Sequence, residues 1–206
     1  MKAIKKSFFI ILMILSLGVF ASCDGYANVA LEDGGSVSFS FSGVLGNGFR
    51  EMMGAVDQEA AIDDEGIANA LTESGFSNVK VASHNNNIII SFVDENRDSY
   101  LFQSGIVSVK KDDIKISLTA EKFLQLYNSS GEDIQMLLDL FLSPVLNDEE
   151  MSEEEYVDTI NVAYGEGAGK EIDESSVHFS VTNKKGKKIT KEIFAKSIFC
   201  GKDFAL

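Results

Sequence analysis

The sequence is poor in proline, cysteine, histidine, tryptophan and positive charge. Its 206 residues include one proline, two cysteines, two histidines and no tryptophan. Two cysteines are too few for a small scaffold held together by disulfides. Against 32 Asp plus Glu there are only 18 Lys plus Arg, which gives a net charge of −14. Nucleic-acid binding is therefore not expected, because it needs clustered cations.

Apolar residues, by contrast, are abundant. The hydrophobic fraction is 45%, well above that of charge-rich disordered chains. The length suits a single domain. Most of the sequence can therefore bury a core.

The N-terminus carries the most specific pattern. Three lysines, Lys2, Lys5 and Lys6, precede an uncharged and almost wholly apolar run at 7–20. That run is shorter than the ~20 apolar residues of a membrane-spanning helix. Its three-part shape is typical of a secretory signal.

The end of this run has the pattern of a lipidation site. Phe20-Ala21-Ser22-Cys23 resembles the lipobox of bacterial lipoproteins. Phe20 departs from the Leu, Val or Ile of the strict pattern, but the relaxed lipobox of spirochaete-type lipoproteins tolerates it. The resemblance covers residues 1–23 only.

The resemblance implies that residues 1–22 are a lipoprotein signal peptide, that cleavage follows Ser22, and that Cys23 carries palmitate-like acyl chains. At ~0.8 kcal/mol per buried methylene, several chains anchor a protein durably. The implied location is the bacterial cell envelope, on its periplasmic side or at the cell surface. The alternative is an ordinary secretory signal cleaved nearby, with Cys23 lost or unmodified.

Removal of residues 1–22 makes the chain more acidic. The remainder has 15 basic and 32 acidic residues, a side-chain balance of −17. Such a body repels anionic headgroups, so we expect the lipid rather than the protein surface to hold it at a membrane. Cys200 is then left without a disulfide partner, and we expect it to be a buried, unreactive thiol.

The rest of the chain predicts one α+β domain at 27–206, after a short tether at 23–26. Alternating apolar residues predict strands, at 27–31, 37–41, 79–81, 88–93, 106–109, 114–118, 177–181 and from 188. The outward-facing serines of the second strand favour a solvated face. Short polar connectors favour an antiparallel sheet built of a meander and hairpins.

Helical spacing predicts five helices, and the last three form a cluster before the C-terminal hairpin. Apolar residues recur at helical intervals in five segments, at about 49–56, 65–74, 120–127, 134–142 and 152–164. The segment 134–142 is the most hydrophobic of the five. We expect it to be either a buried helix or the wall of a cavity for an apolar ligand or partner. Residues 194–206 show no clear period.

No motif indicates catalysis. The glycine-rich stretch at 165–170 has Tyr164 and Glu171 where a phosphate loop needs Gly and Ser or Thr, so it predicts a helix end and a turn. His84 and His178 lie apart, without metal-ligand spacing.

One spacing suggests a metal. Asp94, Asn96 and Asp98 have the oxygen-ligand pattern with which calcium loops begin. Ser99 and Gly105 stand where an EF-hand has Gly and a bidentate Glu. An acidic hairpin turn is the alternative interpretation.

These observations predict a lipid-anchored binding or scaffold module of the cell envelope. We expect no catalysis, no cofactor and no nucleic acid, and either a protein partner or a small apolar ligand. Two alternatives are an envelope hydrolase that uses carboxylates and a calcium-dependent binding protein.

Overall fold

The computed structural model describes residues 24–44, 46–47, 63–129, 135, 139 and 150–206. Among these residues, no helix has the length and apolar character needed to cross a membrane.

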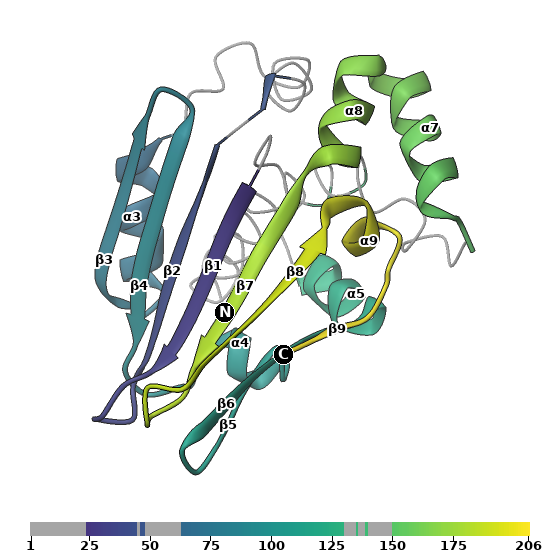
Figure 1. Cartoon of the computed structure of the whole chain (residues 1–206). Helices are drawn as coiled ribbons and strands as arrows, with labels where there is room; N and C mark the ends of the chain where they lie inside the picture. The colour runs from purple at the N-terminus through teal and green to yellow at the C-terminus, as the bar shows by residue number, and fades with distance from the viewer. Residues whose placement is uncertain (1–23, 45, 48–62, 130–134, 136–138, 140–149) are drawn as a thin grey trace.

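A six-stranded sheet forms the centre of the molecule (Figure 1). Its strands are β1 (Asp24–Leu31), β2 (Val37–Val44), β3 (Ser77–His84), β4 (Asn87–Asp94), β7 (Ser176–Thr182) and β8 (Lys188–Phe194). Their order is β3-β4-β2-β1-β7-β8. Neighbouring strands are antiparallel, except that β1 and β7 are parallel.

One face of this sheet forms the core. Every second residue of the central strands is buried: Ala27, Val29, Leu31, Val37, Phe39, Phe41, Ile88, Ile90, Phe92, Val177, Phe179 and Val181. Because side chains alternate along a strand, the residues between them point to the opposite face. The two-residue period of the sequence therefore sets which face is buried.

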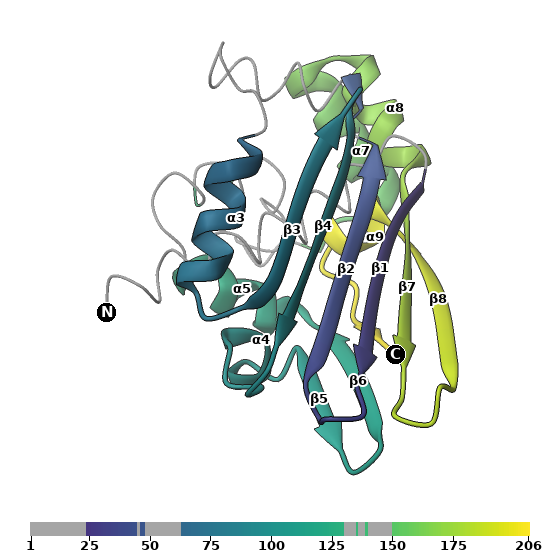
Figure 2. The same ribbon diagram turned by 90° about the vertical axis from the view of Figure 1, so that its left-hand side faces the viewer.

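Smaller elements cover the buried face. They are α3 (Asp64–Glu73), α4 (Tyr100–Gln103), α5 (Ala120–Ser129) and a second sheet of β5 (Val107–Lys110), β6 (Asp113–Leu118) and β9 (Phe204–Ala205). Figure 2 shows α3, α4 and α5 on one side of the six-stranded sheet. The described helices leave the other side uncovered.

Three further helices lie towards one end of the strands: α7 (Glu153–Tyr164), α8 (Glu166–Glu174) and α9 (Ala195–Phe199). Helix α7 begins with a capping box, in which Ser152 Oγ accepts from the Glu155 amide and the Glu155 carboxylate accepts from the Ser152 amide. This reciprocal pair satisfies two amides at the helix start.

The α+β class is confirmed. The antiparallel meander is not the arrangement of the sheet, because β2 pairs with β4, β1 is parallel to β7, and β5 and β6 form a separate sheet. A parallel pair needs a long crossover, and more than a hundred residues separate β1 from β7. The sequence pattern gives the strands but not these long-range pairings.

Two local predictions also need correction. Residues 24–26, expected to be a tether, are the first residues of β1. Residues 165–170, expected to be a helix end and a turn, do contain the end of α7 at Gly165 (φ 94°), but a new helix, α8, follows at once. The predicted helices 49–56 and 134–142 fall outside the described residues, apart from Gln135 and Asp139.

Candidate functional site: the open face of the sheet

The uncovered side of the six-stranded sheet, here called the open face, carries the residues between the buried ones. The pairing register aligns Ile89 of β4, Ser42 of β2, Tyr26 of β1, His178 of β7 and Glu192 of β8 in one row. Neighbouring strands lie about 4.8 Å apart, so the row spans roughly 19 Å. It crosses the sheet from β4 to the edge strand.

Two rings stack at the centre of this row. The Tyr26 and His178 rings lie 5.1 Å apart between centroids, with 19° between their planes. Tyr26 is 47% exposed. His178 Nε2 lies 4.0 Å from Glu192 Oε1, so protonation of the imidazole would create an ion pair. The stack holds the tyrosine ring in place while leaving much of it accessible.

A polar row runs beside the aromatic one, formed by Ser40, Asn28, Ser180 and Thr190. Ser180 Oγ donates to Asn28 Oδ1, and Lys188 Nζ donates to the same oxygen at 3.5 Å. Ser180 is only 2% exposed. These contacts fix the Asn28 amide, which lies two residues along β1 from Tyr26 on the same face.

Exposed apolar side chains are present on the open face. Ile89 is 53% exposed and Phe194 is 45% exposed, and the register places both on the same side as Tyr26. Scattered apolar residues are normal on a surface. Here they share one face with fixed hydroxyl and amide groups, a combination typical of binding sites.

The sequence did not lead to the open face as a candidate site, although the alternation that defines this face is visible in β1. The alternation of Ala27, Val29 and Leu31 already places Tyr26 and Asn28 on the other side of β1. The sequence could not show that β7 lies beside β1, and this pairing brings His178 to Tyr26.

The predicted lipidation residue, Cys23, lies outside the described residues, immediately before β1. Cys200 is half-buried rather than fully buried. Burial raises the pKa of its thiol to about 11. The thiol is therefore protonated at neutral pH, as expected of an unreactive cysteine.

The predicted calcium residues occupy the connector after β4. Asp94 is 3% exposed, and its carboxylate accepts from the Arg97 amide at 2.7 Å and the Ser99 amide at 3.3 Å. Asn96 and Asp98 are exposed. Within the described ranges, no three His, Cys, Asp or Glu side chains are placed to hold a metal together. The Asp94 oxygens are engaged by the backbone of their own turn.

An apolar cavity of about 60 Å³ lies inside the domain. Its walls include Phe39, Phe92, Leu101, Ile106 and Phe179. An apolar cavity that holds benzene has a volume of ~150 Å³. This cavity is too small for such a ligand, so the open face is the better place for one.

Comparison of the chain with known protein families, curated proteins and solved structures gave no match.

Proposed function

We propose that this protein is a lipid-anchored module of the bacterial cell envelope that binds a ligand on the open face of its sheet and catalyses no reaction. The acylated residue in this proposal is Cys23. The ligand contacts the row from Ile89 through Tyr26 to Glu192.

The single observation that carries the binding function is the accessible Tyr26 ring, stacked on His178 and bordered by the Asn28 amide. A fixed aromatic surface contributes binding energy at a small entropic cost, because a tyrosine side chain has only two rotatable angles to restrict. Adjacent amide and hydroxyl groups add specificity. Binding to this arrangement requires neither a conformational change nor an activated nucleophile.

The position of β1 supports anchoring as part of the same design. Because β1 begins at Asp24, a lipid on Cys23 would be joined directly to a central strand of the sheet. The start of β1 would then be held close to the membrane, without a long spacer.

Anchoring is tested by labelling cells with radioactive palmitate and separating membrane from soluble fractions. The wild-type protein should carry the label and sediment with membranes. A Cys23→Ala variant should carry no label and leave the membrane fraction. Label retained on Cys23→Ala would overturn the assignment of Cys23.

Binding is tested with a photo-crosslinking amino acid placed at Ile89 in living cells. Val162, which is 90% exposed on α7, is the matched control position. We expect a discrete adduct from position 89 that disappears when Tyr26→Ala is added, and none from position 162. Adducts of equal yield from both positions, insensitive to Tyr26, would show that the open face has no ligand.

A further inference from the structure

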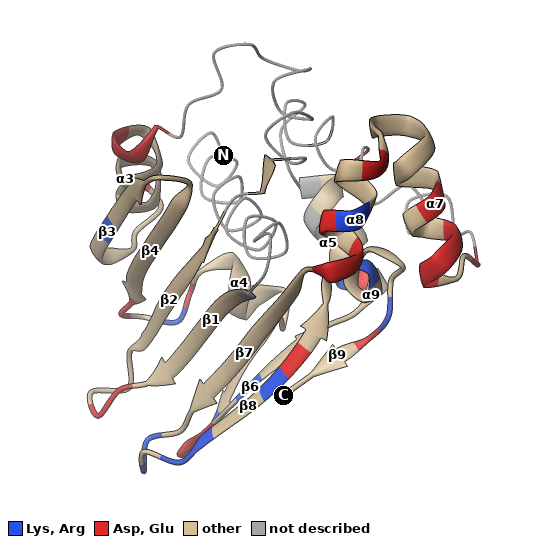
Figure 3. Cartoon of the chain, turned by 45° about the horizontal axis from the view of Figure 1, so that its top comes forward, with Lys and Arg blue, Asp and Glu red and all other residues tan. Residues whose placement is uncertain are grey.

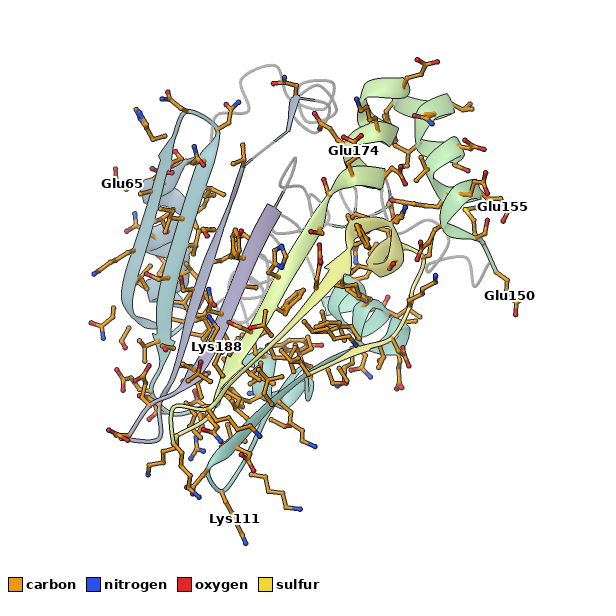
Figure 4. All side chains as sticks on the ribbon, in the orientation of Figure 1. Glu65, Lys111, Glu150, Glu155, Glu174 and Lys188 are labelled. Atoms are coloured by element: carbon orange, nitrogen blue, oxygen red, sulfur yellow. The ribbon has the colours of Figure 1, made fainter. Side chains whose placement is uncertain are left out.

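Lysines gather where the ends of two hairpins meet. The β5–β6 hairpin carries Lys110 at the end of β5 and Lys111 in the turn, and the β7–β8 hairpin carries Lys184, Lys185 and Lys187 in the turn and Lys188 at the start of β8. All six are exposed. We call this group the lysine end. Figure 3 shows the lysines of the β7–β8 turn beside the strand ends, and Figure 4 labels Lys111 and Lys188.

Specific contacts bring the two turns together. The Lys184 amide donates to the Asp112 carbonyl at 3.0 Å, and Asn183 Nδ2 donates to Asp113 Oδ1 at 3.0 Å. Lys185 Nζ also lies 3.3 Å from Asp112 Oδ2. The two aspartates therefore join the hairpins, while six lysines against two aspartates leave a local side-chain charge of +4.

The turns hold the lysines in defined positions. Asn183 Oδ1 accepts from the amides of Lys185 and Lys187, at 3.0 and 2.9 Å. Lys111 adopts φ 59°, a conformation that favours Gly or Asn. A lysine at this strained position places its charge at the outermost point of the hairpin.

The acidic composition makes this grouping unusual. The chain from residue 24 onwards has a side-chain balance of −17, yet the lysine end is positive. The nearby acidic residues, Glu32 and Asp33 of the β1–β2 turn, are exposed and reduce the local potential on one side. Like charges that lie near one another repel, so an anion bound among these lysines would reduce the repulsion.

The lysine end lies far from the anchor. Strands β1 and β7 are parallel, and both run from the end next to Cys23 towards the turns. Eight residues of β1 extend about 25 Å at ~3.3 Å per residue. The Debye length at 0.1 M salt is only about 10 Å. With the strands directed away from the membrane, the headgroups at the anchor lie beyond the Debye length of these lysines.

We propose that the lysine end binds an anionic polysaccharide of the cell envelope or its surroundings, away from the anchoring membrane. The choice of a polysaccharide rests on the proposed envelope location. All six cations are lysines, which act as point charges, whereas arginine recognises planar acids in a fixed geometry. The turn residues 110–113 and 183–188 include no aromatic side chain, so bases have nothing to stack on.

The experiment measures binding of the lipidated protein, purified in nonionic detergent, to dextran sulfate, with uncharged dextran as a control. A double variant, Lys111→Gln with Lys187→Gln, removes two charges from the lysine end. Its matched control is Lys80→Gln with Lys170→Gln, at exposed positions on β3 and α8. Melting temperatures of all three proteins establish that they are folded.

We expect dextran sulfate to bind and to raise the melting temperature. The lysine-end variant should bind about tenfold more weakly, and its salt dependence should fall by about two units of slope on logarithmic axes, whereas the control variant should match the wild type. Absence of wild-type binding, or equal loss in both variants, would overturn the proposal.

Two other anionic ligands distinguish a polysaccharide partner from a nucleic acid or a membrane. Double-stranded DNA or phosphatidylglycerol vesicles that bound as tightly as dextran sulfate, at equal charge concentration and through the same lysines, would contradict the polysaccharide assignment. Palmitate labelling of Cys23 is independent of these titrations. A negative result for polysaccharide binding therefore leaves the anchoring test unaffected, and a negative result for anchoring leaves the binding test unaffected.

Discussion

At the scale of single residues, Asp94 illustrates a buried carboxylate used by its own turn. It ends β4, and both of its oxygens accept from backbone amides within the next five residues. Buried amides that lose a charged acceptor are costly, because they are left without a partner in a site shielded from water.

Replacement of Asp94 should therefore reduce stability without involving a metal. We expect Asp94→Ala to lower the free energy of unfolding by about 1–3 kcal/mol, measured by urea denaturation in chelator. Asp98→Ala, at an exposed position in the same connector, should have little effect. A melting temperature that rises with millimolar calcium in the wild type, but not in Asp94→Ala, would instead support the calcium interpretation.

At the scale of elements, α7 and α8 approach closely through a glycine. Gly169 is buried, and a Cβ atom at this position would overlap the side-chain amide of Asn161 on α7. Gly167, two residues earlier in α8, has no atom within 4 Å of such a Cβ. The same substitution therefore meets two different environments in one helix.

These glycines should respond in opposite directions to alanine. Gly167→Ala should raise the free energy of unfolding by up to about 1 kcal/mol, because alanine has the higher helix propensity. Gly169→Ala should lose this gain to the clash with Asn161 and become less stable than the wild type. Thermal and urea unfolding of both variants measure these changes. An equal increase in stability in both variants would show that α7 and α8 do not pack as described.

Helix α7 is also tied to the C-terminal segment by charge. Glu153 Oε1 accepts from Lys202 Nζ and from Ser197 Oγ, each at 2.5 Å. The hydrogen bond from Lys202, followed by that from Ser197, lowers the pKa of the Glu153 carboxyl below its usual 4.5. A carboxyl whose pKa is lower in the folded than in the unfolded state stabilises the protein at pH values above its unfolded-state pKa. This stabilisation is lost as the pH falls through the folded-state pKa.

The contribution of Glu153 to stability should consequently depend on pH. Glu153→Gln should reduce stability at pH 7 by about 0.5–1 kcal/mol, the range of partly exposed pairs, and the difference from the wild type should shrink below about pH 4. Glu154→Gln, exposed in the same first turn, controls for the helix dipole. A difference that stayed constant from pH 7 to pH 3 would contradict this account of the pair.

At the scale of the whole molecule, the ends of the strands differ in charge and in distance from Cys23. Acidic residues are prominent on α7 and α8, where Figure 4 labels Glu155 and Glu174, and the lysine end lies at the other end of β1 and β7. If Cys23 is acylated and the strands are directed away from the membrane, α8 lies near the membrane and Lys111 lies far from it.

Energy transfer to labelled lipids tests this orientation. A donor dye is attached to Lys111→Cys or, as the matched position, to Lys170→Cys on α8, in protein anchored to neutral liposomes. Cys200 should label poorly, because burial raises the pKa of its thiol to about 11. We expect stronger transfer from position 170 than from position 111. The reverse order would show that the hairpin turns face the membrane.

The limits of the sequence are clearest in the charge distribution. The excess of acidic residues correctly describes the whole chain, but it does not show that cations are clustered at one place on the surface. Lys110 and Lys184 are 74 positions apart, and contacts between two turns bring their hairpins together. Composition sums the charges and carries no information about their positions in space.

The sequence by itself determined the α+β class, the alternation that separates the buried and open faces of β1, β2 and β7, and the helix predicted at 152–164, which is α7. Each depends on residues close together in the chain, where backbone geometry fixes side-chain direction. Only the tertiary structure decided that β7 lies parallel to β1, that Tyr26 stacks on His178, and that two lysine-bearing turns meet. These outcomes depend on how distant segments share one core, and no local period encodes that choice.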